Sequence, residues 1–187
     1  FATTEATWTG ASPELLVSLE DGAVRATSLA GSRGREADLE ADRRAMEELL
    51  ADPKERSEHA FVAEALHDSL SPLCADLAMP EMPHVISLPN IHHLYTPLDG
   101  LVADGVDILD LAAAVHPTPA VGGFPRAEAL EAIRRLENMD RGWYAGPIGW
   151  VDFDGEGEFA VALRSGLLGE GEAVLFAGAG IVAESVP

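Results

Sequence analysis

The chain has 187 residues, of which 47% are hydrophobic, so it is long enough to bury one sizeable core. It contains no run near the roughly 20 continuous apolar residues of a membrane span, so we expect a soluble protein without a membrane partner. The formal net charge of -20 repels nucleic acid, which excludes nucleic acid as an expected partner. The single cysteine, Cys74, lies in an apolar stretch with helical spacing and can form no internal disulfide, which favours a reducing, cytoplasmic location.

The chain begins with the pattern of a hairpin followed by a helix. Asp21-Gly22 is a turn pair, and the apolar runs 14–19 and 23–28 flank it, which is typical of a β-hairpin. The spacing of apolar residues then predicts a helix over 35–51.

A second helix is predicted from residue 54 to about residue 76. Glu58 precedes Val62 by four residues and Leu66 by eight, which places Glu58 on the line of the inward apolar stripe. A carboxylate aimed at the interior needs a partner. It is either a first-turn glutamate stabilised by the helix N-terminus and Lys54, or a metal ligand, and the residues alone favour the first interpretation.

The second half of the chain predicts helices followed by strands. Four prolines first divide the chain into short extended pieces: Pro80, Pro83, Pro89 and Pro97. Helices are predicted over 108–115 and from Pro125 to about residue 138. From Trp143 onward, short apolar runs and the polar turns 154–157 and 169–171 predict an antiparallel meander. The pattern indicates an α+β fold with antiparallel β-sheets flanked by helices.

Two charged residues lie where functional groups are often placed. Glu14 follows the turn 10–13 at the start of a strand, where the alternative is a surface glutamate. Arg164 ends the run 158–164, and alternation places it with small alanines on the side opposite the bulky residues. Its guanidinium can bind a carboxylate through two hydrogen bonds, and a strand-end arginine in solvent is an equally good interpretation.

Glycines and histidines add weaker signals. Gly178 and Gly180 allow a close approach of the backbone to a ligand or a sheet bend, and the stretch 29–32 has the same two interpretations. His92 and His93 are adjacent in an extended segment and point to opposite faces, so no zinc-ligand spacing is present.

Three motifs carry a family resemblance. They are His-Pro-Thr-Pro-Ala-Val-Gly-Gly at 116–123, Asp-Arg-Gly-Trp-Tyr-Ala-Gly at 140–146 and Phe-Ala-Gly-Ala-Gly-Ile-Val at 176–182. The chain resembles the isochorismate synthases of the chorismate-utilising enzyme family from about residue 10 to residue 187. The segment 119–124 departs from the pattern of anthranilate and aminodeoxychorismate synthases, and the same departure argues against salicylate synthases.

The resemblance implies a fold, a reaction and a set of site residues. It implies antiparallel sheets surrounded by helices, with chorismate as the small-molecule substrate and Mg²⁺ as the cofactor. Glu14 matches the family's general acid, and Glu58 in Lys-Glu-Arg-Ser-Glu-His matches a magnesium ligand. The positions that match substrate-binding residues are Gly31, His93, Ala120, Tyr144, Leu163, Arg164 and Gly178.

The resemblance also implies that residues 1–187 form a partial catalytic domain, the C-terminal part of a longer one. The family's general base is a lysine upstream, whereas Lys54 is the single lysine here, and a second magnesium-binding glutamate is expected beyond Pro187. We therefore expect the isolated chain to be inactive. The alternatives are another chorismate-utilising enzyme or an inactive chorismate-binding module. The acidic composition is similar to that of proteins from salt-loving organisms, and the sequence indicates no oligomeric state.

Overall fold

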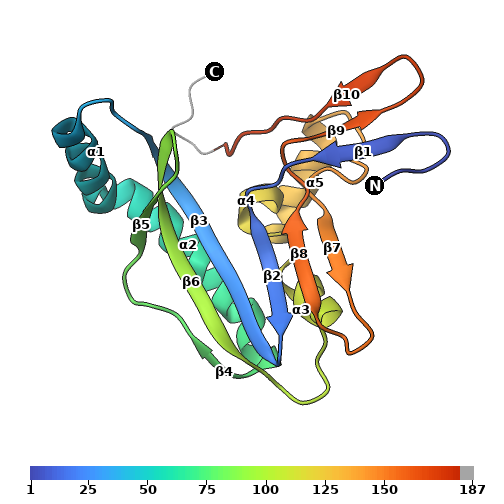
Figure 1. Cartoon of the computed structure of the whole chain (residues 1–187), viewed down its shortest axis with the longest axis horizontal. Helices are drawn as coiled ribbons and strands as arrows, with labels where there is room; N and C mark the ends of the chain where they lie inside the picture. The colour runs from blue at the N-terminus through green and yellow to red at the C-terminus, as the bar shows by residue number, and fades with distance from the viewer. Residues whose placement is uncertain (182–187) are drawn as a thin grey trace.

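The computed structural model describes residues 1–181, in which the strands form two antiparallel sheets (Figure 1). The larger sheet has seven strands in the order β4-β6-β3-β2-β8-β7, with β5 also paired to β6, and the smaller sheet has the order β1-β9-β10. The strands are β1 (Thr7–Gly10), β2 (Leu15–Glu20), β3 (Ala23–Gly34), β4 (Cys74–Ala78), β5 (His84–Ser87), β6 (Ile91–Val102), β7 (Pro147–Val151), β8 (Gly157–Val161), β9 (Ser165–Leu168) and β10 (Ala173–Leu175). The predicted α+β class is confirmed.

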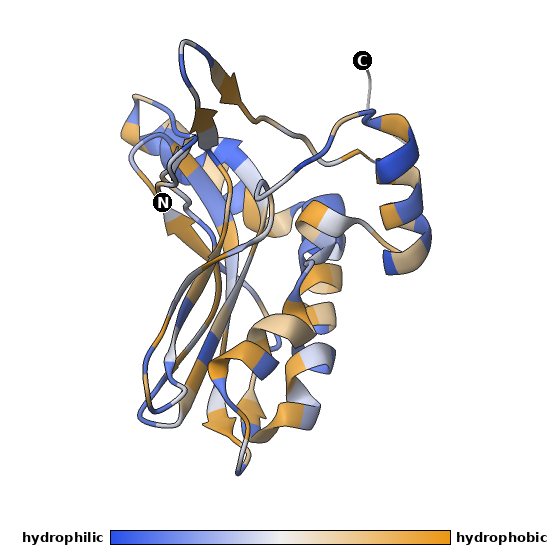
Figure 2. Ribbon diagram, turned by 90° about the vertical axis from the view of Figure 1, so that its right-hand side faces the viewer, coloured by the Kyte–Doolittle hydropathy of each residue, from blue (hydrophilic) through white to orange (hydrophobic). Residues whose placement is uncertain are grey.

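Helices cover one face of the larger sheet. In Figure 1 the second and third helices lie behind the strands, and Figure 2 shows the helical layer standing beside them. The helices are α1 (Leu39–Ala51), α2 (Pro53–Leu70), α3 (Ile108–Val115), α4 (Pro119–Gly122) and α5 (Arg126–Leu136). None of the helices within residues 1–181 is long and apolar enough to cross a bilayer.

The main core lies between the larger sheet and the helices α2 and α3. Leu16 and Leu98 from the strands pack with Leu66 and Leu70 of α2 and with Leu111 of α3, and all five side chains are buried. Burying each large aliphatic side chain stabilises the fold by about 1.5–3 kcal/mol. A second core of Trp8, Tyr144, Ala145 and Ala162 lies against the smaller sheet. The two cores share Leu163 as a partly buried neighbour.

The predicted hairpin is confirmed, because β2 and β3 are joined by Asp21 and Gly22. Both residues have positive φ, 50° and 74°, which is the backbone of a type I′ turn. The helix predicted over 108–115 is confirmed as α3. Its N-terminus has a reciprocal capping box, in which Asp107 accepts from the Asp110 main chain and Asp110 accepts from the Asp107 main chain.

An ion-pair network around the buried Asp42 side chain fixes α1 and corrects the helix start predicted at residue 35. Arg35 donates to both carboxylate oxygens of Asp42, the Glu36 main chain donates to the same carboxylate, and His92 Nε2 lies 3.0 Å from Asp42 Oδ1. These bonds hold Arg35 and Glu36 outside the helix, so α1 begins at Leu39. They also hold the pKa of Asp42 well below its usual range.

The second predicted helix ends earlier than expected. It stops at Leu70, followed by a short 3-10 turn at Ser71–Leu73, because Pro72 lacks the N–H that continues a helix. Cys74 therefore begins β4 and does not lie in a helix, and burial raises the pKa of its thiol.

Two predictions about strands also need correction. Pro97 does not divide the chain into short pieces but lies inside the long strand β6, between the stretches paired with β5 and β4. No described strand pairs with β6 on that side at Pro97, so a missing N–H is tolerated there. The predicted meander after Trp143 is two separate hairpins, because β8 belongs to the larger sheet and β9 to the smaller one.

We predict that Asp42→Asn lowers the melting temperature at pH 7 by several degrees. The folded-state pKa of Asp42 lies below its ordinary value of 3.8, so its stabilising contribution is complete above pH 3.8 and is lost as pH falls further. The difference between the two proteins should therefore shrink below pH 4 in thermal unfolding followed by circular dichroism. Asp99→Asn is the matched control, because Asp99 pairs with Arg25 on the exposed surface. An equal loss in both variants would contradict the prediction.

Candidate active site

Three of the predicted substrate-binding residues meet beside the long β3–β6 pair. The register shifts between Ala30 and Ser32, and Gly31 in this bulge has a φ of +78°, a conformation that favours glycine. His93 of β6 bonds to the Gly31 main chain, and its Nδ1 lies 2.7 Å from Ser32 Oγ. Burial lowers the pKa of His93, and the nearby positive charge of Arg164 lowers it further. Gly31 and His93 are therefore in contact, and Arg164 is near enough for its charge to act on the His93 imidazole.

Arg164 is placed by a turn and not by strand alternation. The strand β8 ends at Val161, and the Leu163 main chain then donates to the Val161 carbonyl at 2.7 Å. Arg164 itself has a φ of 47°, and its carbonyl accepts from the Ala11 main chain at 3.2 Å. The expected alternation along 158–164 is wrong beyond Val161. The exposed guanidinium is available to a ligand.

Glu14 lies at the entry to β2, in the segment 11–14 that crosses beside residues 161–164. The Val161 main chain donates to the Glu14 carbonyl at 3.0 Å, and the Glu14 main chain donates to Ser12 Oγ at 3.3 Å. Ser12 Oγ in turn donates to the Val161 carbonyl. Burial raises the pKa of the Glu14 carboxyl above its ordinary value of 4.5, so this side chain holds its proton more strongly than a surface glutamate does.

Tyr144 and Gly178 form one wall near the smaller sheet. The Tyr144 ring is buried and stacks on Phe176, with 5.1 Å between ring centroids. A Cβ on Gly178 would lie 2.5 Å from the Tyr144 hydroxyl oxygen, so the glycine backbone approaches this hydroxyl too closely for a side chain. Leu163 contacts this core and the main core. The motif over 176–182 ends at Val182, which lies outside the described residues.

Ala120 lies apart from the residues above. It is exposed on the short helix α4, and no contact described within residues 1–181 joins its side chain to Gly31, His93 or Arg164. Its neighbour Val121 packs against both cores, which fixes the position of α4.

The structure corrects the predicted direction of Glu58. The buried residues of α2 are His59, Ala63, Leu66 and Leu70, so the inward stripe runs one position further along the chain than expected. The Glu58 side chain is 43% exposed, and its Oε1 lies 3.7 Å from Lys54 Nζ. This carboxylate is accessible to an ion from solvent.

The donor set around Glu58 fits one cation only in part. Within residues 1–181, no three His, Cys, Asp or Glu side chains gather closely enough to hold a metal ion. Mg²⁺ keeps several waters and is commonly bound through one or two carboxylates together with its substrate. An accessible single carboxylate is compatible with that mode, so Glu58 fits as one ligand of a magnesium ion.

The sequence reasoning missed Glu55 beside Gly31, and it did not single out Thr118. Glu55 Oε2 lies 3.0 Å from the position of a Cβ on Gly31, and the spacing of Glu55 from Glu58, i and i+3, could have indicated one shared helix face. Thr118 is buried between two prolines, and its Oγ1 has no hydrogen-bond partner among the described residues. A buried hydroxyl without a partner is unusual, and the Pro-Thr-Pro sequence was the available signal.

The chain is similar to known proteins over nearly all of its length. The salicylate biosynthesis isochorismate synthase of Pseudomonas aeruginosa is 48% identical over 178 residues, which cover 95% of this chain and 37% of that protein. The structure of MenF, the menaquinone-specific isochorismate synthase from Escherichia coli, has a TM-score of 0.87 at 34% identity, covering 98% of this chain and 42% of that one. The chain thus spans less than half the length of these relatives.

The fold is also similar to that of an anthranilate synthase. Anthranilate synthase component I from Streptococcus pneumoniae has a TM-score of 0.87 at 29% identity, covering 98% of this chain and 40% of that one. A profile of the family described as chorismate binding enzyme matches residues 1–187. Because that match covers the whole sequence, the chain belongs to the chorismate binding enzyme family.

Proposed function

We propose that this chain is part of an isochorismate synthase, an isomerase that converts chorismate to isochorismate with Mg²⁺. The observation that carries the proposal is the burial of Glu14, which raises the pKa of its carboxyl next to the turn that presents Arg164. The names of the similar enzymes from P. aeruginosa and E. coli support the same reaction. We also propose that the protein is cytoplasmic and acts in menaquinone or siderophore synthesis.

The reaction exchanges the position of a ring hydroxyl. Water adds to one ring carbon, the ring double bonds shift, and the existing hydroxyl leaves, so the product is an isomer and no water is consumed overall. The leaving hydroxyl needs a proton. Glu14 supplies it as general acid, because a carboxyl that stays protonated nearer neutral pH can donate. The base that accepts the proton from water is assigned to a lysine outside these 187 residues.

Arg164, His93 and Gly31 orient the substrate. Arg164 binds a substrate carboxylate, since a planar guanidinium offers paired N–H donors. His93, neutral because burial lowers its pKa, is anchored to the Gly31 main chain and to Ser32. The Tyr144 ring and the Gly178 backbone, which lie against each other, provide a further wall. These residues hold the ring in one orientation relative to Glu14.

Glu58 is the residue of this chain that would hold the magnesium ion. When bound, the ion neutralises charge on the ring carboxylate of the substrate. The remaining ligands would be water, the substrate and a glutamate outside the described residues. Glu55 lies one helical turn before Glu58 on the side of Gly31 and is placed to order the same region.

The product of the full reading frame tests the proposal. With chorismate and Mg²⁺, chromatography should show isochorismate whether or not ammonium is present. The isolated 187-residue chain, which lacks the assigned base, should give none. An aminated product or released pyruvate would contradict the proposal and favour another enzyme of the family, and unchanged chorismate would favour an inactive binding module.

We predict that Glu14→Gln strongly lowers kcat and stabilises the fold at pH 7. Loss of a general acid lowers kcat by about 10²–10⁴-fold. The folded-state pKa of Glu14 is raised, so the wild type is stabilised while the carboxyl is protonated and loses that stability as pH rises through the raised pKa. The melting temperature of the variant should therefore exceed that of the wild type at pH 7 and converge with it near pH 4. Glu158→Gln, on the exposed side of β8, is the control for both readouts. A kcat of Glu14→Gln equal to that of the wild type would contradict the assignment of Glu14 as the general acid.

Glu58→Gln should weaken the response to magnesium with little effect on stability. Removing one carboxylate ligand is expected to raise the Mg²⁺ concentration for half-maximal activity by at least about tenfold. The side chain is exposed, so its melting temperature should stay near that of the wild type. Glu64→Gln, exposed on the same helix, is the matched control. Equal Mg²⁺ titrations for the two variants would show that Glu58 is no ligand.

A further inference from the structure

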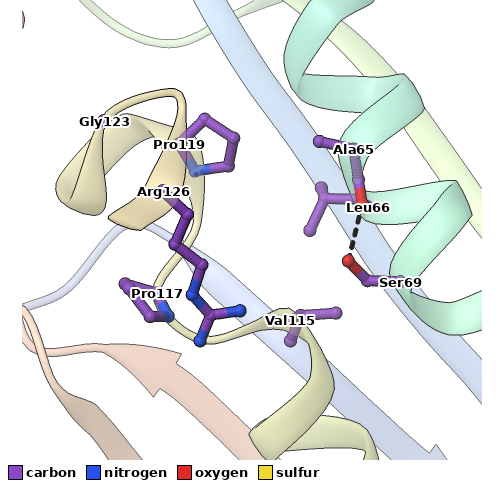
Figure 3. A pocket seen from close by; sticks show the side chains of 8 residues that line it. All are labelled: Ala65, Leu66, Ser69, Val115, Pro117, Pro119, Gly123 and Arg126. Atoms are coloured by element: carbon purple, nitrogen blue, oxygen red, sulfur yellow. Dashed lines mark hydrogen bonds between the residues drawn. The ribbon is translucent and has the colours of Figure 1, made fainter. Parts of the chain in front are cut away.

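A pocket outside the proposed active site lies between α2 and the segment that leads into α5 (Figure 3). It encloses about 90 Å³. Its floor is apolar, formed by Leu66 of α2, Val115 at the end of α3, and the rings of Pro117 and Pro119. Neither Glu14 nor Arg164 contributes to its lining, so the proposed reaction leaves this pocket without a role.

Arg126 is the charged group of this pocket. Figure 3 shows its side chain running along the pocket, with the guanidinium between Pro117 and Val115. Its Nη2 donates to the His116 carbonyl. Among the ion pairs within residues 1–181, Arg126 has no carboxylate partner, although the chain carries 32 acidic residues. A guanidinium has five N–H donors, so donors remain for a ligand beside this one bond.

The other polar group of the lining does not compete for an anion. The Ser69 hydroxyl donates its proton to the Ala65 carbonyl at 2.8 Å, as the dashed line in Figure 3 marks. The recognition chemistry is therefore one cation above an apolar floor. It matches a ligand with a single carboxylate and a short apolar body. The volume restricts that body to a few carbon atoms.

The pocket shares its backbone with a predicted substrate-binding residue. Pro119 and Gly123 line the pocket, and Ala120 lies between them on α4. This segment is tightly packed, because a Cβ on Gly122 would lie 2.8 Å from the Pro117 ring and one on Gly123 would lie 2.7 Å from Ala129 Cβ. A ligand that widens the pocket must therefore displace α4 as a unit.

We propose that this pocket is a second binding site, for a small monocarboxylate with a short apolar body, and that its occupancy controls the segment that carries Ala120. Arg126 binds the carboxylate, and Leu66, Val115 and the prolines bury the apolar body. The proposed binding of a monocarboxylate rests on the geometry of the pocket and does not depend on the proposed function. The control step rests on the proposed function, because Ala120 is a substrate-binding residue only under it.

Binding is tested on the full-length protein with acetate, propionate and butyrate, followed by NMR titration. Affinity should rise by up to about fourfold for each added methylene until the pocket is full. Propionamide, which has the same shape without the charge, should bind at least tenfold more weakly than propionate. Arg126→Met should lose at least tenfold in propionate affinity, whereas Arg134→Met, exposed on the same helix, should not. Equal binding of propionamide, or unchanged binding to Arg126→Met, overturns the site.

A second variant distinguishes loss of the binding site from misfolding of Arg126→Met. Ala65→Phe fills the pocket from α2 and leaves Arg126 in place, so it should also abolish propionate binding while its thermal transition stays cooperative. Propionate should then change kcat or KM for chorismate in the wild type and not in Ala65→Phe. If propionate binds and the kinetics do not change, the control of α4 is wrong. Turnover of the wild type without propionate reports separately on the proposed function.

Discussion

The pairing of β3 with β6 is the constraint on which the other parts of the structure depend. The two strands run together from Ala23 to Gly34, and the shift at Gly31 is the irregularity in that register. His59 of α2 bonds to the Ala30 carbonyl at 3.0 Å and to Thr96 Oγ1 at 2.7 Å, so the helix is attached to both strands at this shift. The side chains of α2 that precede His59 are thereby fixed relative to the bulge.

The relation between the two sheets depends on a second, shorter set of bonds. Residues 161–164 leave the larger sheet and enter the smaller one, and the segment 11–14 crosses beside them. Main-chain bonds join Val161 to Glu14 and Arg164 to Ala11, and Leu163 packs on both cores. The proposed acid and the proposed carboxylate-binding group are thus both held where the chain crosses between the two sheets.

Sequence patterns predicted the regular parts of this fold and failed where tertiary contacts override local preference. The Asp21-Gly22 hairpin and the helix α3 follow from turn chemistry and apolar spacing. The residues before α1 were assigned to a helix, because the pattern does not show that Arg35 bonds to Asp42. Glu58 was placed on the inward stripe, although one residue along a helix is a rotation of about 100° and the buried position belongs to His59.

The same limit explains why residues such as Gly31 and Arg164 were predicted from family motifs and not from periodicity. Gly31 lies in a bulge and Arg164 has positive φ, and such breaks have no period to detect. The motifs indicate which residue types are present but not where their side chains point, which only the folded chain shows.

The ionisation of Glu14 also affects the binding of a charged ligand. In a chain of net charge -20, an ionised Glu14 would repel the carboxylates of the proposed substrate, and burial opposes that ionisation by raising the pKa of the Glu14 carboxyl. Under the proposed function, the raised pKa of Glu14 favours binding of an anionic substrate as well as proton donation.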